Sequence, residues 1–337
     1  MAPSTIRSAA LANFADVARQ VGLDPFALVR RVGIDARALT DGDLRVSAAR
    51  VAELLECAAS DANCPTFGLR MAESRKTSDF GAVSLVISHQ ATLRDVLETM
   101  VRYRNLLNST LALHVEMVGD IFDVKEELVV DFDGPKTQSY ELAVGILSRL
   151  FRSILGDRWR PVAAHFTHAR PADTGIHRRL FGERVEFDAD FNGLSGLASD
   201  LDRANVAADP ALARYAHQFV ETLNDARQSS MEHETRKAVY LLLPLGGASI
   251  ERVARSLGVH ERTLQRRLAE EGVEFSDLVN GVRRELVERY LANPAYSLTR
   301  IAEMLGYGQL SSFTRWFAAQ FGAAPSAWRK ARAIRAP

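Results

Sequence analysis

An internal repeat near the end of the chain constrains its fold more than any other feature of the sequence. When the chain is shifted by 48 positions, six residues align with six others at identical spacing, and each aligned pair has the same chemical character. In each copy, apolar residues three and four apart share one helix face, and the closing glycine is suited to ending a helix. Each copy therefore predicts a short helix and a tight turn. The copies are Ser249, Ile250, Val253, Ala254, Leu257 and Gly258, and Ser297, Leu298, Ile301, Ala302, Leu305 and Gly306.

A second helix is expected after each closing glycine. Leu264 and Leu268 lie four residues apart behind the first copy, and Phe313 and Phe317 do so behind the second. A short helix, a glycine turn and a second helix form the helix-turn-helix arrangement, whose second helix enters the major groove of DNA. We expect two such units joined by one connecting helix, so that they meet successive grooves of one duplex. The predicted units are residues 249–271 and 297–321.

The second helix of the first unit presents a polar face. At 100° per residue, Arg262, Gln265 and Arg266 lie opposite Leu264 and Leu268. A basic stripe is also typical of an ordinary solvated helix. The preceding helix and turn favour the interpretation that this face binds DNA. Arginine can bridge O6 and N7 of guanine, and glutamine can bridge N6 and N7 of adenine.

The charge of the chain is divided unevenly between its two parts. The 337 residues carry 42 basic and 42 acidic side chains, so the whole chain is neutral. Residues 236–337 hold 16 Lys or Arg and 9 Asp or Glu, a balance of +7, which leaves −7 on residues 1–235. The basic part is the part with the predicted helix-turn-helix units, and its binding to phosphates should weaken with salt.

Length and composition indicate a globular protein of two or three domains. The chain is 47% apolar, which suffices for packed cores. It contains no apolar run near the ~18 residues that span a bilayer, and its first residues lack the apolar segment of a signal peptide. Cys57 and Cys64 are expected to be reduced and structural. We therefore expect a cytoplasmic protein without a membrane partner.

The larger N-terminal part is expected to be a mixed α+β domain. Residues 10–32, 47–60 and 92–107 have helical periodicity, whereas residues 111–132 alternate around a Gly-Asp turn and predict a β-hairpin. Two later segments add strand candidates. The predicted organisation is an α+β effector-sensing and dimerisation domain, a polar linker and an all-α DNA-binding domain. These parts are residues 1–223, 224–235 and 236–337.

Signatures of catalysis are weak. His165 and His168 lie three apart in a predicted strand and should face opposite sides, with His177 further on, so no metal site is expected. Glu126 and Glu127 look like the solvated end of a strand. The sequence has no glycine-rich phosphate loop and no Gly-x-Ser-x-Gly elbow. We therefore predict no catalytic residue, no cofactor and no enzymatic activity.

One candidate for binding an effector lies in the N-terminal part. Tyr103, flanked by Arg102 and Arg104, is suited to anchoring an anionic molecule. The alternative is that these arginines are solvated residues beside the apolar face of a helix and bind no ligand. Arg102 and Tyr103 are the predicted effector-binding residues.

The C-terminal residues resemble the AraC family of transcription regulators. The segment "RRELVERYLANPAYSLTRIAEMLGYGQLSSFTRWFAAQFGAAPSAWR" looks like the C-terminal signature of this family, and "SIERVARSLGVHERTLQRRLAEEG" looks like its first helix-turn-helix. The resemblance implies a bihelical DNA-binding domain in which the first recognition helix reads bases with Arg262, Gln265 and Arg266. For the second recognition helix it implies four residues, which are Leu310, Ser311, Thr314 and Arg315.

Two departures from the family pattern are visible. His260 stands where a capping Ser or Thr is usual, so capping of the first recognition helix should be weaker or come from elsewhere. Gly308 and Leu310 stand where polar residues are more usual in the second unit, and leucine can only pack on a thymine methyl group. We expect the first recognition helix to discriminate bases more strongly.

The N-terminal part resembles the effector domain of one AraC-type subfamily, described as arabinose-binding-like, which includes ornithine-utilisation regulators. The matching segments include "DFGAVSLVISHQATLRDVLETMVRYRNLLN" and "HFTHARPADTGIHRRLFGERVEFDADFNGL". The resemblance implies a sensing and dimerising domain, and the family label does not predict arabinose as the ligand.

The sequence thus predicts a one-component transcription regulator. A small-molecule effector would bind the N-terminal domain of a homodimer and change its hold on double-stranded promoter DNA, and an activator would also contact RNA polymerase. Two alternatives come from other classes of protein. They are an enzyme tethered to DNA and an adaptor whose arginine helices dock on a protein.

Overall fold

The computed structural model describes residues 4–225, 230–245, 247–294 and 296–335. The chain divides into two compact units, Met1–Gln228 and Ser229–Pro337. The first unit combines helices with two sheets and the second is helical, so the predicted fold class is confirmed. No helix within the described ranges has both the length and the apolar character that crossing a bilayer requires.

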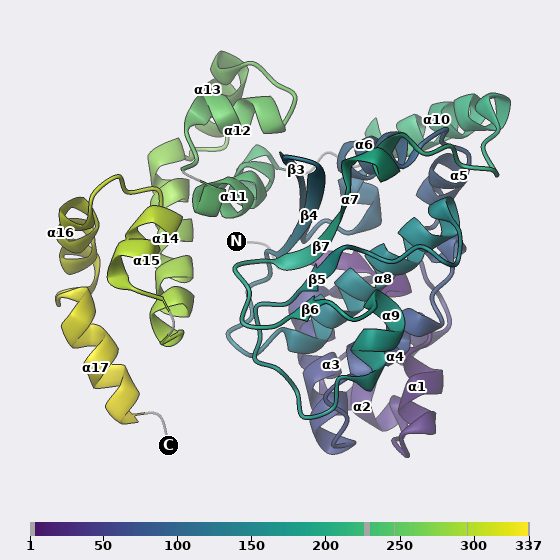
Figure 1. The fold of residues 1–337 in the computed structure, drawn as a ribbon, viewed down its shortest axis with the longest axis horizontal. Coiled ribbons are helices and arrows are strands. Elements are labelled where there is room, and N and C mark those ends of the chain that lie inside the picture. Colours follow the sequence, from purple (N-terminus) through teal and green to yellow (C-terminus); the bar gives the residue numbers. More distant parts are fainter. Residues whose placement is uncertain (1–3, 226–229, 246, 295, 336–337) are drawn as a thin grey trace. The chain divides into compact units, whose positions relative to one another are not determined.

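The larger sheet of the first unit has five strands in the order β3-β4-β7-β5-β6 (Figure 1). β3 and β4 form the predicted hairpin, and the turn between them places Gly119 at a φ of 62°, where a side chain would be strained. β7 pairs antiparallel with both β4 and β5, and β6 joins β5 in parallel. The strands are β3 (Leu111–Val118), β4 (Ile121–Leu128), β5 (Ala163–His165), β6 (Val185–Glu186) and β7 (Asn192–Leu197).

Helix α8 (Thr137–Leu155) packs against β4, β7 and α4 (Phe67–Glu73). Helices α4 and α8 approach so closely that a Cβ atom on Gly68 would lie 2.1 Å from the carbonyl oxygen of Gln138. A Cβ atom on Gly145 would lie 2.5 Å from the Cβ atom of Ala72. The two glycines therefore set the distance between these helices.

The first unit has two apolar cores. One gathers side chains of the N-terminal helices and the small sheet, and the other lies between the large sheet and the helices from α5 to α10. The small sheet pairs β1 (Thr5–Arg7) with β2 (Arg45–Ser47). The remaining helices are α1 (Phe14–Gln20), α2 (Pro25–Arg31), α3 (Ala48–Asp61), α5 (Val83–Ser88), α6 (Leu93–Arg102), α7 (Arg104–Leu107), α9 (Gly175–Phe181) and α10 (Pro210–Asp225).

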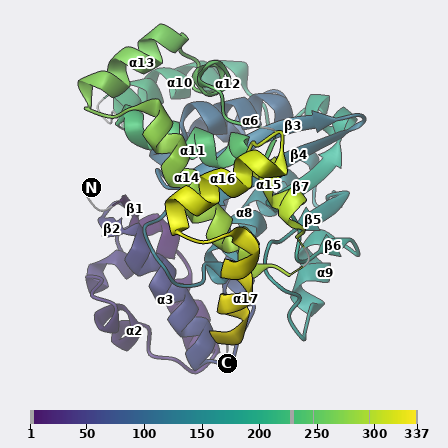
Figure 2. The ribbon, with the colours of Figure 1, turned by 90° about the vertical axis from the view of Figure 1, so that its left-hand side faces the viewer.

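The two copies of the repeat fold alike in the second unit. Ser249 and Ser297 cap their helices, each accepting a hydrogen bond from the backbone N–H three residues later. Gly258 and Gly306 end the short helices with φ values of 69° and 76°. Figure 2 shows α13 and α16 at two levels along α14. The helices are α11 (Met231–Leu242), α12 (Ile250–Ser256), α13 (Glu261–Glu270), α14 (Phe275–Ala292), α15 (Leu298–Met304), α16 (Leu310–Phe321) and α17 (Pro325–Arg335).

The predicted linker comprises residues 224–235, and its last residues are helical. Helix α11 begins at Met231, because the hydroxyl group of Ser230 accepts a hydrogen bond from the backbone N–H of His233 at 3.1 Å. Acidic residues in the first turn also suit the positive end of the helix dipole. Residues 226–229 of the predicted linker lie outside the described residues.

Candidate nucleic-acid interface

Helix α13 presents the predicted polar face to solvent. Leu264 and Leu268 are fully buried against the rest of the second unit. Arg262, Gln265 and Arg266 are exposed on the other side of the helix. A carboxylate oxygen of Glu270 is 3.9 Å from Nε of Arg266, but both side chains are exposed, so this ion pair holds the guanidinium only weakly. The two arginines and the glutamine are therefore available to a ligand along one stripe.

The start of α13 corrects the expectation drawn from His260. We expected weak capping or a cap from elsewhere, but the Nδ1 atom of His260 accepts a hydrogen bond from the backbone N–H of Arg262 at 3.3 Å. An unprotonated imidazole nitrogen is an acceptor, so it replaces the hydroxyl oxygen of a Ser or Thr cap. The first recognition helix is thus capped by its own N-cap residue.

Helix α16 carries the other predicted DNA-binding residues. Leu310, Ser311 and Arg315 are exposed, while Thr314 is half-buried. The hydroxyl group of Thr314 donates a hydrogen bond to the carbonyl oxygen of Leu310 at 2.9 Å, so its proton is engaged within the helix. Ser312, which the sequence analysis did not single out, is also exposed in the first turn of α16. This helix offers fewer free polar groups than α13.

The second helix-turn-helix is anchored to α14 by a residue that the sequence analysis missed. The Nε atom of Arg283 donates a hydrogen bond to the carbonyl oxygen of Leu305 at 3.1 Å. The guanidinium also lies over the ring of Tyr307, 4.6 Å from its centroid, which is a cation–π geometry. Arg283 therefore fixes the turn between α15 and α16 on the connecting helix. Arg283 opens the segment that resembles the family, but helical spacing alone does not indicate this role.

The predicted effector residues lie at the contact between α6 and α10. Tyr103 is fully buried, and its hydroxyl oxygen is 2.9 Å from the Nδ1 atom of His217. Burial raises the pKa of Tyr103 and lowers the pKa of His217, so both groups are held neutral. Arg102 forms an exposed ion pair with Glu221 of α10. The structure thus places both residues where they attach α10 to α6.

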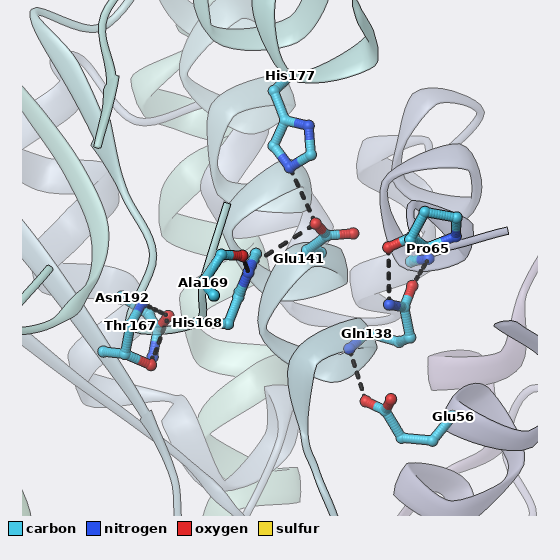
Figure 3. Close-up of polar contacts among 10 residues, drawn as sticks. Glu56, Pro65, Gln138, Glu141, Thr167, His168, Ala169, His177 and Asn192 are labelled. Atoms are coloured by element: carbon cyan, nitrogen blue, oxygen red, sulfur yellow. Dashed lines mark hydrogen bonds and ion pairs between the residues drawn. The ribbon is translucent and has the colours of Figure 1, made fainter. Parts of the chain in front are cut away.

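The three histidines separate into two environments. His165, on β5, lies 2.8 Å from the hydroxyl oxygen of Ser195, whereas His168 lies beyond the end of β5. His168 and His177 both reach Glu141 of α8, with Nε2–Oε1 distances of 3.6 and 2.9 Å (Figure 3). Spacing in the sequence could not reveal this buried carboxylate. The described part of the chain contains no group of three or more His, Cys, Asp or Glu placed to hold a metal ion.

The carboxylates of β4 differ from expectation. Glu126 and Glu127 were expected at a solvated strand end, but Glu126 is only 3% exposed. It alternates with Phe122, Val124 and Leu128, so it occupies an inward position of the strand. Burial raises the pKa of Glu126 to about 8. Glu127 points the other way and accepts a hydrogen bond from the hydroxyl group of Tyr140 at 2.7 Å.

The chain matches a known protein family over most of its N-terminal unit. The family described as "Arabinose-binding domain of AraC transcription regulator, N-term" matches residues 22–205, which is more than half of the chain. The chain belongs to the AraC family of transcription regulators. A "Helix-turn-helix domain" matches residues 253–331 and so includes both α13 and α16.

Individual AraC-family members match over most of their length. The "HTH-type transcriptional regulator VirS" of Mycobacterium tuberculosis is 31% identical over 328 residues, which cover 97% of this chain and 96% of that protein. The "Ornithine utilization regulator" of Pseudomonas aeruginosa is 27% identical over 274 residues, which cover 79% of each. The crystal structure of the transcriptional regulator CdpR from Pseudomonas aeruginosa matches with a TM-score of 0.46 and 22% identity, covering 90% of this chain and 96% of that one.

The predicted function is confirmed by these matches. The chain is a DNA-binding transcription regulator with an N-terminal effector domain, and neither the enzyme nor the adaptor alternative is favoured. The family consists of transcription regulators.

Proposed function

We propose that this AraC-family regulator reads promoter DNA mainly through α13, with α16 as a weaker second reader. The observation that carries the proposal is the exposed stripe of Arg262, Gln265 and Arg266 opposite a buried leucine pair. These three side chains can pair with guanine and adenine edges in the major groove. Leu310, Ser311, Thr314 and Arg315 would add apolar contacts and phosphate contacts from α16. We propose residues 236–337 as the DNA-binding domain and residues 1–223 as the effector-sensing domain.

Salt titration tests this mode of binding. Each phosphate neutralised by a Lys or Arg releases counterions, so the logarithm of the affinity should fall linearly with the logarithm of the salt concentration. We expect a slope steeper than about −4 for promoter DNA, measured by fluorescence anisotropy between low and moderate salt. A promoter fragment should bind at least about 1,000-fold more tightly than random DNA at physiological salt. A flat slope would instead support a protein-binding role for the arginine helices.

We also propose a homodimer whose contact is the outer face of α10. Leu212, Tyr215 and Phe219 recur at helical spacing and are exposed by 49%, 71% and 52%. Large apolar side chains on one helix face favour burial against another protein surface, and a second copy offers the same face in return.

A regulator that works on DNA must share its compartment with the chromosome, so we place the protein in the cytoplasm. An activator would bring RNA polymerase as a further partner, and we propose no enzymatic step.

Phe219→Glu should disrupt this dimer. A carboxylate on the apolar face would be buried in the dimer without a partner, so we expect the dimer dissociation constant to rise at least about 100-fold. Sedimentation equilibrium measures the change. Gln218→Glu adds the same charge at an exposed neighbouring position of α10 and should leave the dimer intact. Equal sedimentation of the wild type and Phe219→Glu would exclude this surface as the contact.

A further inference from the structure

A cavity of about 160 Å³ lies within the first unit. It is formed by β3, β4, α3, α6 and α8 together with the N-terminal segment. Its volume is close to that of an engineered cavity of about 150 Å³ that binds benzene. Neither Arg102 nor Tyr103 belongs to its wall. The wall is mostly aliphatic, and representative residues are Val51, Leu55, Met100, Leu113, Leu128 and Ile146.

Glu126 is the unusual member of this wall. Its neighbours on the inward face of β4 are apolar, and its own side chain is 97% buried, since only 3% is exposed. Its Oε2 atom has no hydrogen-bond partner among the residues that the structure describes. A buried carboxyl oxygen without a hydrogen bond destabilises the fold by about 1–3 kcal/mol, so such an oxygen usually has a hydrogen-bond donor as its partner. The carboxyl group of Glu126 is therefore the acceptor in this wall that a bound hydrogen-bond donor could satisfy.

Four of the five cations of the wall are bound within the protein, and the fifth, Lys76, is exposed. Arg7 pairs with Asp43, and the guanidinium of Arg104 and the ammonium of Lys136 each donate to a backbone carbonyl oxygen. The terminal nitrogens of buried Arg75 donate to the carbonyl oxygens of the first 3₁₀ turn, which leaves only its Nε atom without a partner among the described residues. The charged residues of the wall are Arg7, Arg75, Lys76, Asp79, Arg104, Glu126 and Lys136.

None of these cations lies where it would hold Glu126 ionised. Burial alone raises the pKa of Glu126 to about 8, whereas a neighbouring cation would lower it. The carboxyl group of Glu126 is therefore mostly protonated at neutral pH. A cationic ligand could exchange its own charge for that proton and pair with the carboxylate, whereas an anionic ligand could only accept one hydrogen bond from the protonated carboxyl group.

We propose that the cavity binds a compact, largely apolar primary amine whose ammonium group donates to Glu126. Hydrogen bonds between an ammonium and a carboxylate are among the strongest in proteins, and the aliphatic wall would cover the rest of such a molecule. The aliphatic part of the wall disfavours a sugar, because the hydroxyl groups of a sugar that face this part would be buried without partners. That this ligand is the effector rests on the proposed function as a regulator.

Benzylamine is the probe, and isothermal titration of the full chain measures its binding. Benzyl alcohol, benzoate and L-arabinose are the comparison ligands. We expect benzylamine to bind at one site per chain and at least about 10-fold more tightly than benzyl alcohol, with no binding of benzoate or arabinose. Failure of benzylamine to bind, or tighter binding of benzoate, would overturn the proposed ligand class.

Variants locate the site. Glu126→Gln keeps the volume but cannot be ionised, so benzylamine should lose its advantage over benzyl alcohol. Ala143→Leu fills the cavity from α8 and should abolish binding of both molecules. Glu127→Gln is the matched control, because its side chain lies on the opposite face of β4 and an amide oxygen still accepts from Tyr140. Wild-type binding by both Glu126→Gln and Ala143→Leu would place the amine elsewhere.

The pH dependence separates an amine from a neutral donor. Below the pKa of Glu126, the ionised fraction rises about tenfold per pH unit, so the affinity for benzylamine should rise by nearly tenfold from pH 6 to 7. The affinity of benzyl alcohol should not rise. An affinity of benzylamine that is constant over this range would contradict pairing with Glu126.

Measurement of DNA binding separates the two proposals. If benzylamine binds through Glu126 but the affinity for promoter DNA stays the same, the cavity is a ligand site and its role as an effector site is wrong. If DNA affinity changes with the amine in the wild type and not in Glu126→Gln, both proposals are supported. If neither protein binds DNA with the salt dependence described above, the proposed mode of DNA binding fails, and the titration results still stand.

Discussion

Arg266→Ala should weaken binding to specific promoter DNA by about 1–3 kcal/mol, or roughly 5- to 150-fold, and relax the preference at one base position. The guanidinium of Arg266 is exposed on the stripe that faces away from buried Leu264 and Leu268, so it can form a bidentate pair with guanine. Anisotropy titrations on a selected promoter site and on each single-base variant of that site measure both effects.

Arg267→Ala is the matched control for this prediction. Arg267 is exposed on the same helix but lies beside the stripe rather than on it, and its loss removes the same charge. Its effect should be smaller and equal on specific and random DNA. Equal losses on both DNAs for Arg266→Ala would contradict base reading. Gln265→Ala should likewise cause a larger loss than Ser311→Ala, and the reverse order would make α16 the stronger reader.

The contribution of Glu126 to the stability of the first unit should fall as the pH rises from about 4.5 to 8. Glu126 has a pKa of about 8 in the folded chain and an ordinary pKa of about 4.5 when it is solvated in the unfolded chain, so the folded state binds more protons over this range. Stability decreases with pH wherever the folded state binds more protons, and the contribution is fully present below pH 4.5 and lost above 8. At about 1.4 kcal/mol per pKa unit, the loss is on the order of 3–5 kcal/mol.

Glu126→Gln should remove most of this pH dependence. Calorimetric unfolding at pH 5, 6.5 and 8 would show a falling transition temperature for the wild type and a flatter one for the variant. Burial also raises the pKa of Glu56, to about 7, which contributes a slope of the same sign in both proteins. Burial lowers the pKa values of His165 and His217, which contributes a slope of the opposite sign in both, so the difference between the two curves reports Glu126. Glu127→Gln should behave like the wild type. Parallel curves for the wild type and Glu126→Gln would show that the carboxyl group is not buried in solution.

The second unit was largely predictable from the sequence because its information is local. The repeated serines, apolar pairs and glycines encode the cap, the buried face and the turn of each helix-turn-helix within about 25 residues. The buried pairs Leu264 with Leu268 and Phe313 with Phe317 follow directly from helical spacing. The capping role of His260 was missed because capping preferences emphasise oxygen acceptors, although an imidazole nitrogen accepts as well.

The interior of the first unit was less predictable because its contacts join distant segments. Glu126 and Glu127 look alike in the sequence, and only the pairing of β4 with both β3 and β7 determines which of them faces inward. Tyr103 carries a flanking arginine on each side, yet its partner His217 lies 114 residues away. The cavity itself arises from helices and strands that no spacing rule connects.

Helix α6 and the residue that follows it make two of the contacts described above. Met100 of α6 forms part of the cavity wall, and Tyr103, just after the last residue of α6, bonds to His217 on the helix that bears the apolar face. Only three positions along the chain separate the wall of the cavity from the contact that holds α10 in place. The bulk of a bound molecule, which sets how far Met100 is displaced, would therefore matter to the position of α10 as much as the charge of that molecule does.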